Sequence, residues 1–294
     1  MKIQIPANIG TWNTITLCVH ILSFYIAKFV CHKRTVLENY MKMTISPIDL
    51  STTTTFKGVF RGLKFRNYDE PLLHPKIVNN GHTGIIIGFN ITGGGLKGEY
   101  NFIEMHFHSP SEHTIDNRKY PLELHIVHMH QSYKNITEAL KDPNGIAVLG
   151  ILFHVSSDDS SIISQITDEA AHLAPKSKIG VHRKIFGKLV VKDFLPKDVS
   201  KNYFFYKGSL TTPPCSEAVL WTVFTDTIPV SLHQIEEFQK MQTEDGHMLK
   251  SNFRIVQKIK GRAVTFIMES RSNIVKPLNS ILFAIVAIFT LLNK

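Results

Sequence analysis

Apolar and polar residues alternate through residues 56–155 of the chain. Valine, isoleucine and phenylalanine recur there in short period-two runs, which predicts many β-strands. The best helix candidates are residues 160–173 and 231–241, and each begins with a serine that can cap a helix. No linker or repeat divides the chain. The pattern predicts a single, mostly β domain of the α+β class with a few peripheral helices.

Two of these runs place histidines on one face of a strand. The first run alternates Glu104, His106 and His108 with Ile103, Met105 and Phe107. The second run alternates Glu123, His125 and Val127 with Leu122, Leu124 and Ile126. Side chains two residues apart on a strand leave the same face, about 7 Å apart at a rise of about 3.3 Å per residue. Two adjacent strands would therefore bring His106, His108 and His125 to one point.

Three imidazoles at one point are typical of a catalytic zinc site. Three protein nitrogens leave one position of a tetrahedral Zn²⁺ open for water or substrate. No cysteine lies near the cluster and no carboxylate is needed as a ligand, which favours zinc over softer or redox metals. Glu104 and Glu123 each precede a candidate ligand by two positions and are predicted to hold its second ring nitrogen. A single strand histidine is more simply a partly buried polar residue, the role assigned to His113, His128 and His130.

The segment resembles the zinc-binding strands of the α-class carbonic anhydrases. A second family signature, Gly-Ser-Leu-Thr-Thr-Pro-Pro, occupies residues 208–214 and is followed by Trp221. Shorter matches keep the family order at residues 46–49, 79–82 and 252–254. The resemblance runs from about residue 46 to about residue 268. It implies the family's large, mostly antiparallel twisted β-sheet.

The resemblance implies a role for each matched polar residue. His106, His108 and His125 would hold Zn²⁺. Thr211 would accept a hydrogen bond from zinc-bound hydroxide and donate its own proton to Glu112, so that a hydroxide lone pair faces the substrate. His82 would carry protons to buffer, because the unperturbed histidine pKa lies near 6.5.

Other matched residues would line or support this site. Asn80 and Thr212 would order the water on the proton path, and Asn252 and the two glutamates would support the ligands. The carbon dioxide pocket of the family matches Val127, Val148, Leu210, Thr212 and Trp221.

The implied reaction is the reversible hydration of carbon dioxide to bicarbonate and a proton by zinc-bound hydroxide, the carbonate dehydratase activity. Zinc lowers the pKa of its water to about 7, and carbonic anhydrase is itself the reference case for that value. The alternative is a catalytically inactive binding or adhesion module. Such relatives typically lose a zinc histidine, whereas all three remain here. A third reading is a chain that keeps the site but folds poorly.

The sequence departs from the family pattern at several positions. Glu104 replaces the usual amide, and a carboxylate there should raise the pKa of zinc-bound water. Ser109 replaces a tryptophan, and Ile85 replaces a polar residue near the proton shuttle. Residues 1–45 lack the usual aromatic-rich segment, which a non-native amino terminus or genuine divergence would explain.

The cysteines also differ from the family arrangement. Extracellular members pair a cysteine before the Ser-Pro match with the one after Pro-Pro. Here Cys215 follows Pro-Pro, but Tyr40 stands near the partner position. Cys31 is the nearest candidate partner, and Cys18 lies in an apolar run. Three cysteines cannot all pair within one chain.

Composition and the two ends of the chain indicate the class of partner and the cellular location. The 294 residues suffice for one large core, and the net charge of +9 is diffuse, without the aromatic-interleaved cluster expected for nucleic-acid binding. Residues 14–30 resemble a signal sequence. Residues 278–292 are apolar but short of the roughly 20 residues of a bilayer span, so a lipid-anchor signal is favoured over a membrane helix.

These features predict three segments. Residues 1–43 form an atypical amino-terminal segment, residues 44–268 the catalytic domain, and residues 269–294 a polar spacer with an apolar anchor signal. The predicted location is the extracellular face of the plasma membrane, reached by the secretory route, where the sequons at Asn90 and Asn135 would be glycosylated. The sequence does not indicate an oligomeric state.

Overall fold

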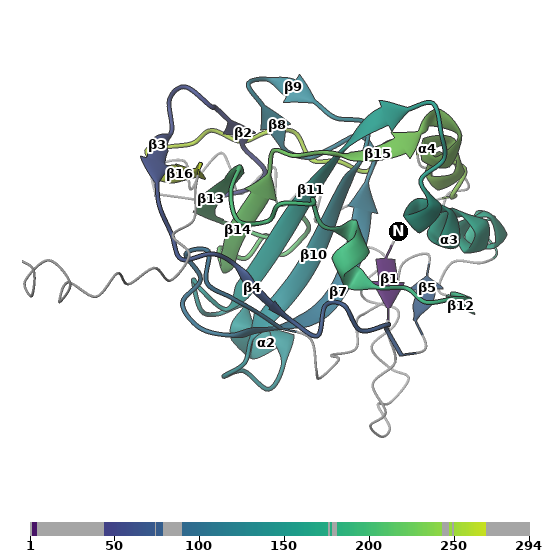
Figure 1. Ribbon diagram of the computed structural model, residues 1–294, viewed down its shortest axis with the longest axis horizontal. Helices are drawn as coiled ribbons and strands as arrows, with labels where there is room; N and C mark the ends of the chain where they lie inside the picture. The colour runs from purple at the N-terminus through teal and green to yellow at the C-terminus, as the bar shows by residue number, and fades with distance from the viewer. Residues whose placement is uncertain are drawn as a thin grey trace, which may run out of the picture.

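The computed structural model describes residues 2–4, 44–73, 75–78, 90–175, 177, 181–242, 247–248 and 250–268. Within these residues the fold is one large curved sheet with a small second sheet above it and short helices at its periphery (Figure 1). The predicted mostly β domain with few helices is confirmed.

The large sheet has 13 strands. Its main path runs β12 (His182–Lys184), β5 (Lys76–Val78), β1 (Lys2–Gln4), β7 (Tyr100–His108), β10 (Glu123–His130), β11 (Ile146–Ser156), β14 (Val219–Phe224), β13 (Tyr203–Gly208), β16 (Val264–Ile267) and β3 (Phe56–Gly58). Off this path, β15 (Ile228–Ser231) pairs with β11, and β4 (Lys64–Arg66) pairs with β6 (Asn90–Thr92), which joins β7. The small sheet holds β2 (Asp49–Leu50), β8 (Thr114–Ile115) and β9 (Arg118–Lys119).

Most neighbouring strands of the large sheet are antiparallel, as expected. The parallel pairs are β11 with β14, β11 with β15, and β16 with β3. The mixed sheet follows from chain order, because β11 and β14 are not consecutive along the chain and the chain crosses over between them.

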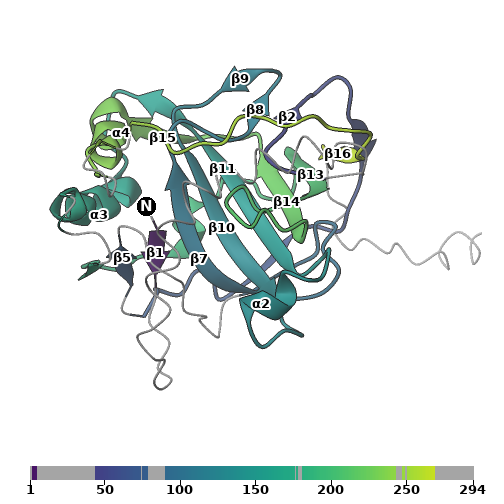
Figure 2. The same ribbon diagram turned by 180° about the vertical axis from the view of Figure 1, so that it is seen from behind.

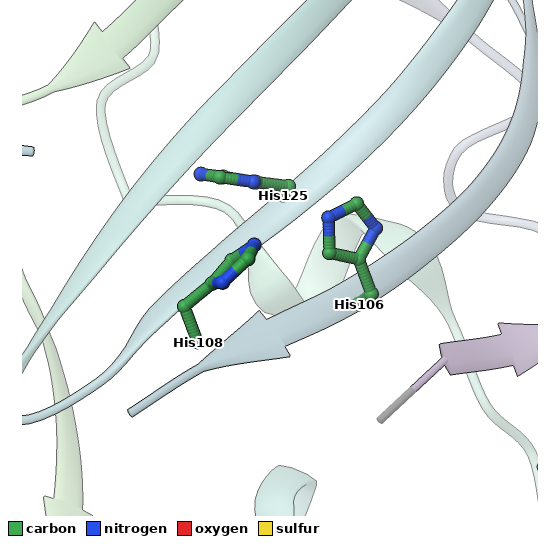
Figure 3. Close-up of side chains that lie close together, drawn as sticks. All are labelled: His106, His108 and His125. Carbon is green, nitrogen blue, oxygen red and sulfur yellow. The ribbon is translucent and has the colours of Figure 1, made fainter. Parts of the chain in front are cut away.

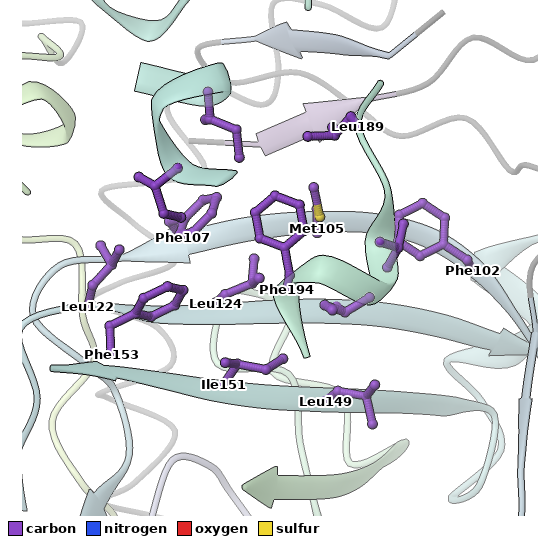
Figure 4. Close-up of a cluster of buried hydrophobic side chains, with 14 of the residues drawn as sticks. Phe102, Met105, Phe107, Leu122, Leu124, Leu149, Ile151, Phe153, Leu189 and Phe194 are labelled. Atoms are coloured by element: carbon purple, nitrogen blue, oxygen red, sulfur yellow. The ribbon is translucent and has the colours of Figure 1, made fainter. Parts of the chain in front are cut away.

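Both faces of the central strands are buried. On one face, side chains of β7, β10 and β11 pack under Phe194 and Leu189 (Figure 4). On the other, Val127, Val148 and Trp221 belong to a second core cluster. Burial on both faces explains why the runs carry so few charged residues beyond those near the histidines.

The prediction that Ile103 shares a strand face with Met105 and Phe107 is wrong. Met105 and Phe107 lie in the first core cluster, but Ile103 lies in the second and Phe102 takes its place. The pairing of β7 with β10 passes from Glu104 opposite Val127 to Phe102 opposite His128, with a register shift between them. Such a β-bulge inserts one residue and reverses the alternation beyond it.

Two of the helices lie where the periodicity predicts them. The first is α3 (Ser161–Ala170), continued by a 3₁₀ turn η1 (Ala171–Leu173), and the second is α4 (Leu232–Gln239). They pack together at one end of the sheet (Figure 2). The short α2 (Ile136–Ala139) and the 3₁₀ turn η3 (Val191–Phe194) were not expected.

Only one of the two predicted serine caps forms. Ser231 makes a capping box with Gln234. The Ser160 side chain makes no cap hydrogen bond. Instead, the Gln234 amide of α4 holds the Ser160 backbone, accepting from its N–H at 3.0 Å and donating to its carbonyl at 2.8 Å. One glutamine therefore fixes the starts of both helices.

Several predicted features lie outside the described residues. These are His82, Asn80, Ile85, the signal-like stretch at residues 14–30 and the tail at residues 278–292. Among the residues that are described, no helix has the length and apolarity to cross a membrane.

His128 lies on the core face of β10 and away from the other strand histidines. Its Nδ1 hydrogen-bonds to the Ala147 carbonyl at 3.2 Å, and its Nε2 hydrogen-bonds to the Tyr68 hydroxyl. Burial lowers the pKa of His128 to about 3, although the backbone hydrogen bonds raise it slightly. The buried ring is therefore neutral near pH 7.

We expect His128 to destabilise the fold in acid. Its folded pKa lies below its unfolded value of about 6.5, so between these values the unfolded chain binds more protons and stability falls as pH falls, by up to about 1.4 kcal/mol per pH unit. Urea unfolding between about pH 7 and pH 5 should show a shallower decline for His128→Gln than for the wild type. The exposed His154→Gln variant is the control, and parallel profiles for wild type and His128→Gln would contradict the expectation.

Candidate metal site

Two neighbouring antiparallel strands present the three predicted ligand histidines. The register of β7 and β10 sets His106 opposite His125 and His108 opposite Glu123. The ring centroids lie 5.1 Å apart for His106 and His108, 5.2 Å for His106 and His125, and 4.6 Å for His108 and His125. One nitrogen from each ring lies within 4.8 Å of the others (Figure 3). The structure thus brings the three imidazoles to one point.

The second nitrogen of each ring faces a partner. Glu123 Oε1 lies 2.8 Å from His125 Nε2, and the Asn252 carbonyl lies 2.8 Å from His108 Nδ1. Glu104 Oε1 lies 3.3 Å from His106 Nδ1. These partners leave His125 Nδ1, His108 Nε2 and His106 Nε2 as the nitrogens that can bind a metal. Both glutamates therefore stand where the alternation placed them.

The donor set fits Zn²⁺. Burial lowers the pKa of His106 to about 3 and that of His108 to about 4, so both rings are neutral and offer a lone pair. His108 Nε2 is buried without a hydrogen-bond partner. An unpartnered buried polar atom is costly unless a ligand binds it. Three imidazole nitrogens without a carboxylate among them are the donors of an open catalytic zinc site.

A second group of possible ligands, His113, Glu123 and His125, does not fit a metal. Glu123 Oε2 accepts the backbone N–H of Glu112 at 2.7 Å and of His113 at 2.8 Å. Glu123 Oε1 lies 2.6 Å from His113 Nδ1. Burial would raise the pKa of Glu123, but the facing His113 and His125 lower it well below its usual range. Glu123 is therefore a carboxylate surrounded by donors.

His113 is a site residue that the sequence reasoning missed. The sequence predicts an ordinary, partly buried polar residue at this position, whereas His113 is fully buried beside Glu123 and its Nε2 lies 2.6 Å from the Tyr206 hydroxyl. No periodicity marks it, because it follows the irregular turn after β7. Only the return of the chain into β10 places it next to Glu123.

The expected hydrogen bond between Thr211 and Glu112 is absent from the described structure. Glu112 is buried, and its Oε1 accepts the Arg254 backbone N–H at 2.8 Å. Its Oε2 accepts no hydrogen bond and lies 3.5 Å from His108 Nε2. Glu112 therefore faces the metal-binding nitrogen of His108, and Thr211 lies half-buried in the loop after β13.

Most of the expected apolar wall lies next to the histidines. Val127, Val148 and Trp221 are opposite one another across β10, β11 and β14. The Trp221 ring centroid lies 4.8 Å from that of His125. Leu210 packs at the edge of this cluster, but Thr212 is exposed on the loop. The row forms an apolar boundary to one side of the imidazoles.

Asn252 has a larger part than expected. Besides its carbonyl bond to His108, its side chain accepts the Ser109 N–H at 2.7 Å and donates to the Phe107 carbonyl at 2.9 Å. These hydrogen bonds hold the end of β7, which carries His108, in place.

Cys215 is disulfide-bonded, and both other cysteines of the chain lie outside the described residues.

Comparison with known proteins agrees with this geometry. The chain matches the family model for eukaryotic-type carbonic anhydrase over residues 37–268. It is 33% identical to carbonic anhydrase 15 of Mus musculus over 245 residues, which cover 76% of this chain and 74% of that protein. It is 36% identical to carbonic anhydrase 7 of Mus musculus over 239 residues, 74% of this chain and 86% of that protein. The chain therefore belongs to the eukaryotic-type carbonic anhydrase family.

Proposed function

We propose that this chain is a zinc enzyme that catalyses the reversible hydration of carbon dioxide to bicarbonate and a proton. Family membership supports this reaction in general terms. The observation that carries the proposal for this chain is the convergence of three imidazoles, those of His108 and His125 buried and that of His106 partly buried, around the unpartnered His108 Nε2. When bound, zinc would supply an acidified water as the nucleophile.

Each group of side chains at this site has a separate role in the proposed reaction. His106, His108 and His125 hold the metal, with Glu104, Glu123 and Asn252 orienting their rings. Val127, Val148, Leu210 and Trp221 exclude water and receive carbon dioxide, which offers almost no hydrogen-bonding groups. Thr211 and Glu112 orient the nucleophile, Thr212 and Asn80 order water, and His82 carries protons to buffer.

The proposal includes a location at the extracellular face of the plasma membrane, with a lipid anchor in place of residues 278–292. The disulfide of Cys215 supports it, because disulfides persist in oxidising compartments. The apolar tail of the sequence supports it as well. The rival reading, an inactive binding module, finds no support in the ligands, since all three histidines are present.

The full chain tests the proposal directly. We expect about one zinc ion per purified chain, measured by elemental analysis, and carbon dioxide hydration in a stopped-flow assay with a pH indicator. Zinc without hydration would establish the binding module. A soluble chain with neither would show that the site does not assemble.

Replacing Thr211 with alanine should lower turnover by about 100-fold without loss of zinc, because one group that orients the reacting water is removed. Stopped-flow hydration rates and zinc content are the two measurements. Thr54→Ala, which removes an exposed hydroxyl from another loop, is the control. Equal rates for Thr211→Ala and the control would refute the role of Thr211.

Replacing Glu104 with glutamine should move the midpoint of the pH–rate profile to lower pH by about 0.5 to 1 unit. The carboxylate beside His106 makes that imidazole a stronger donor and reduces the positive charge that zinc presents to water. Glu99→Gln, just before the same strand, should leave the midpoint in place. An unshifted or higher midpoint in Glu104→Gln would count against this effect.

A further inference from the structure

We propose that Ser46 is a positioning residue of the metal site, which acts on His125 through a chain of buried side chains and on the Thr211 loop through Ser209. The inference rests on the proposed zinc function. Ser46 lies at the start of the domain, far from the histidines in sequence, and contacts neither carbon dioxide nor the metal under this proposal.

Every polar atom of Ser46 is engaged. Its N–H donates to Ser209 Oγ at 2.9 Å, and its carbonyl accepts from Arg254 Nη1 at 2.9 Å. Its Oγ accepts from the Tyr206 hydroxyl at 3.0 Å and from the Ser209 N–H at 3.1 Å. The same Arg254 donates its backbone N–H to Glu112. Ser46 thus links its own segment to residues 206–209 and to Arg254.

The first arm leads from Ser46 to a metal ligand. The Tyr206 oxygen lies 2.6 Å from His113 Nε2, His113 Nδ1 lies 2.6 Å from Glu123 Oε1, and Glu123 Oε1 lies 2.8 Å from His125 Nε2. All five residues of this hydrogen-bonded series, from Ser46 to His125, are at most 1% exposed. Because water has no access to replace a lost partner, a displaced group leaves its neighbour unsatisfied, and the neighbour must move.

The second arm leads from Ser46 to the loop. Ser209, which exchanges two hydrogen bonds with Ser46, donates its hydroxyl to the Leu210 carbonyl at 2.8 Å and accepts from Trp221 Nε1 at 3.1 Å. Thr211 follows directly. The space beside Ser46 is closed, since a Cβ on Gly208 would collide with its Oγ. The Ser46 hydroxyl therefore positions both Glu123, the partner of the ligand His125, and Ser209, where the Thr211 loop begins.

A purely structural role of Ser46 and a positioning role predict different results. Loss of a buried, hydrogen-bonded hydroxyl lowers stability in either case. Only a positioning role predicts that loss of the Ser46 hydroxyl weakens zinc binding, because Glu123 would then hold His125 less firmly. Partners that orient metal-binding histidines typically contribute 10- to 100-fold in metal affinity.

The test measures zinc release from the full, zinc-loaded chain by transfer to a chromogenic chelator. We expect Ser46→Ala to release zinc about 10-fold faster than the wild type, the lower end of that range because Ser46 acts through three intermediates. Tyr206→Phe breaks the same hydrogen bond from the other side and should give a similar rate. The double variant should be no worse than either single variant.

Ser231→Ala is the matched control, because Ser231 is also buried and hydrogen-bonded but caps α4. Urea unfolding places the variants on one stability scale. Equal zinc release in Ser46→Ala and Ser231→Ala, or additive effects of Ser46→Ala and Tyr206→Phe, would overturn the inference. Zinc release needs no turnover, so a chain that binds zinc without hydrating carbon dioxide fails the proposed reaction and still tests Ser46. A wild-type chain that takes up no zinc overturns both.

Discussion

Replacing His106 with asparagine should abolish both zinc retention and carbon dioxide hydration. Two nitrogens remain in His106→Asn, and two are too few to hold an open tetrahedral zinc site. Zinc content should fall from about one ion per chain to a small fraction of that after dialysis, and hydration should fall to the uncatalysed rate. Elemental analysis and stopped-flow hydration measure the two losses.

The same exchange at an exposed histidine gives the control. His154 lies on β11 of the same sheet, exposed and hydrogen-bonded to Thr227. His154→Asn should keep both zinc and activity. Full hydration activity in His106→Asn would refute the ligand assignment, and loss of zinc in both variants would show that the assay reports general instability.

Replacing Glu123 with glutamine should give the largest loss of stability of any single change at the site. Glu123 accepts from two backbone N–H groups and faces His113 and His125. A glutamine amide nitrogen would set a donor against these donors and remove the buried negative charge. The free energy of unfolding of the zinc-free chain should fall by about 3–5 kcal/mol, and zinc affinity by 10- to 100-fold.

Urea unfolding near pH 7 and competition with a chelator measure these two losses. Glu236→Gln, on the exposed face of α4, should change stability by less than about 0.5 kcal/mol. A Glu123→Gln chain as stable as this control would show that the four contacts contribute little. A large stability loss with unchanged zinc affinity would mean that Glu123 supports the fold without acting on His125.

The amino-acid sequence by itself determined the strand runs, the positions of α3 and α4, and the face shared by Glu104, His106 and His108. These depend on local periodicity, which alternates on a strand and repeats every 3.6 residues on a helix. The same alternation indicated that two adjacent strands would bring the three histidines together, and the likeness of residues 46–268 to carbonic anhydrases assigned these histidines to zinc. The register that sets His106 opposite His125 agrees with that expectation.

Only the tertiary structure decided what lies around those histidines. The bulge that moves Ile103 to the other face, the Gln234 bridge to Ser160, and the direction of Glu112 all depend on contacts between segments distant in sequence. His113 and Ser46 sit in irregular segments, where no period marks which atoms will meet. Their burial beside Glu123 and Tyr206 removes water as a partner, so the fold alone selects their hydrogen bonds.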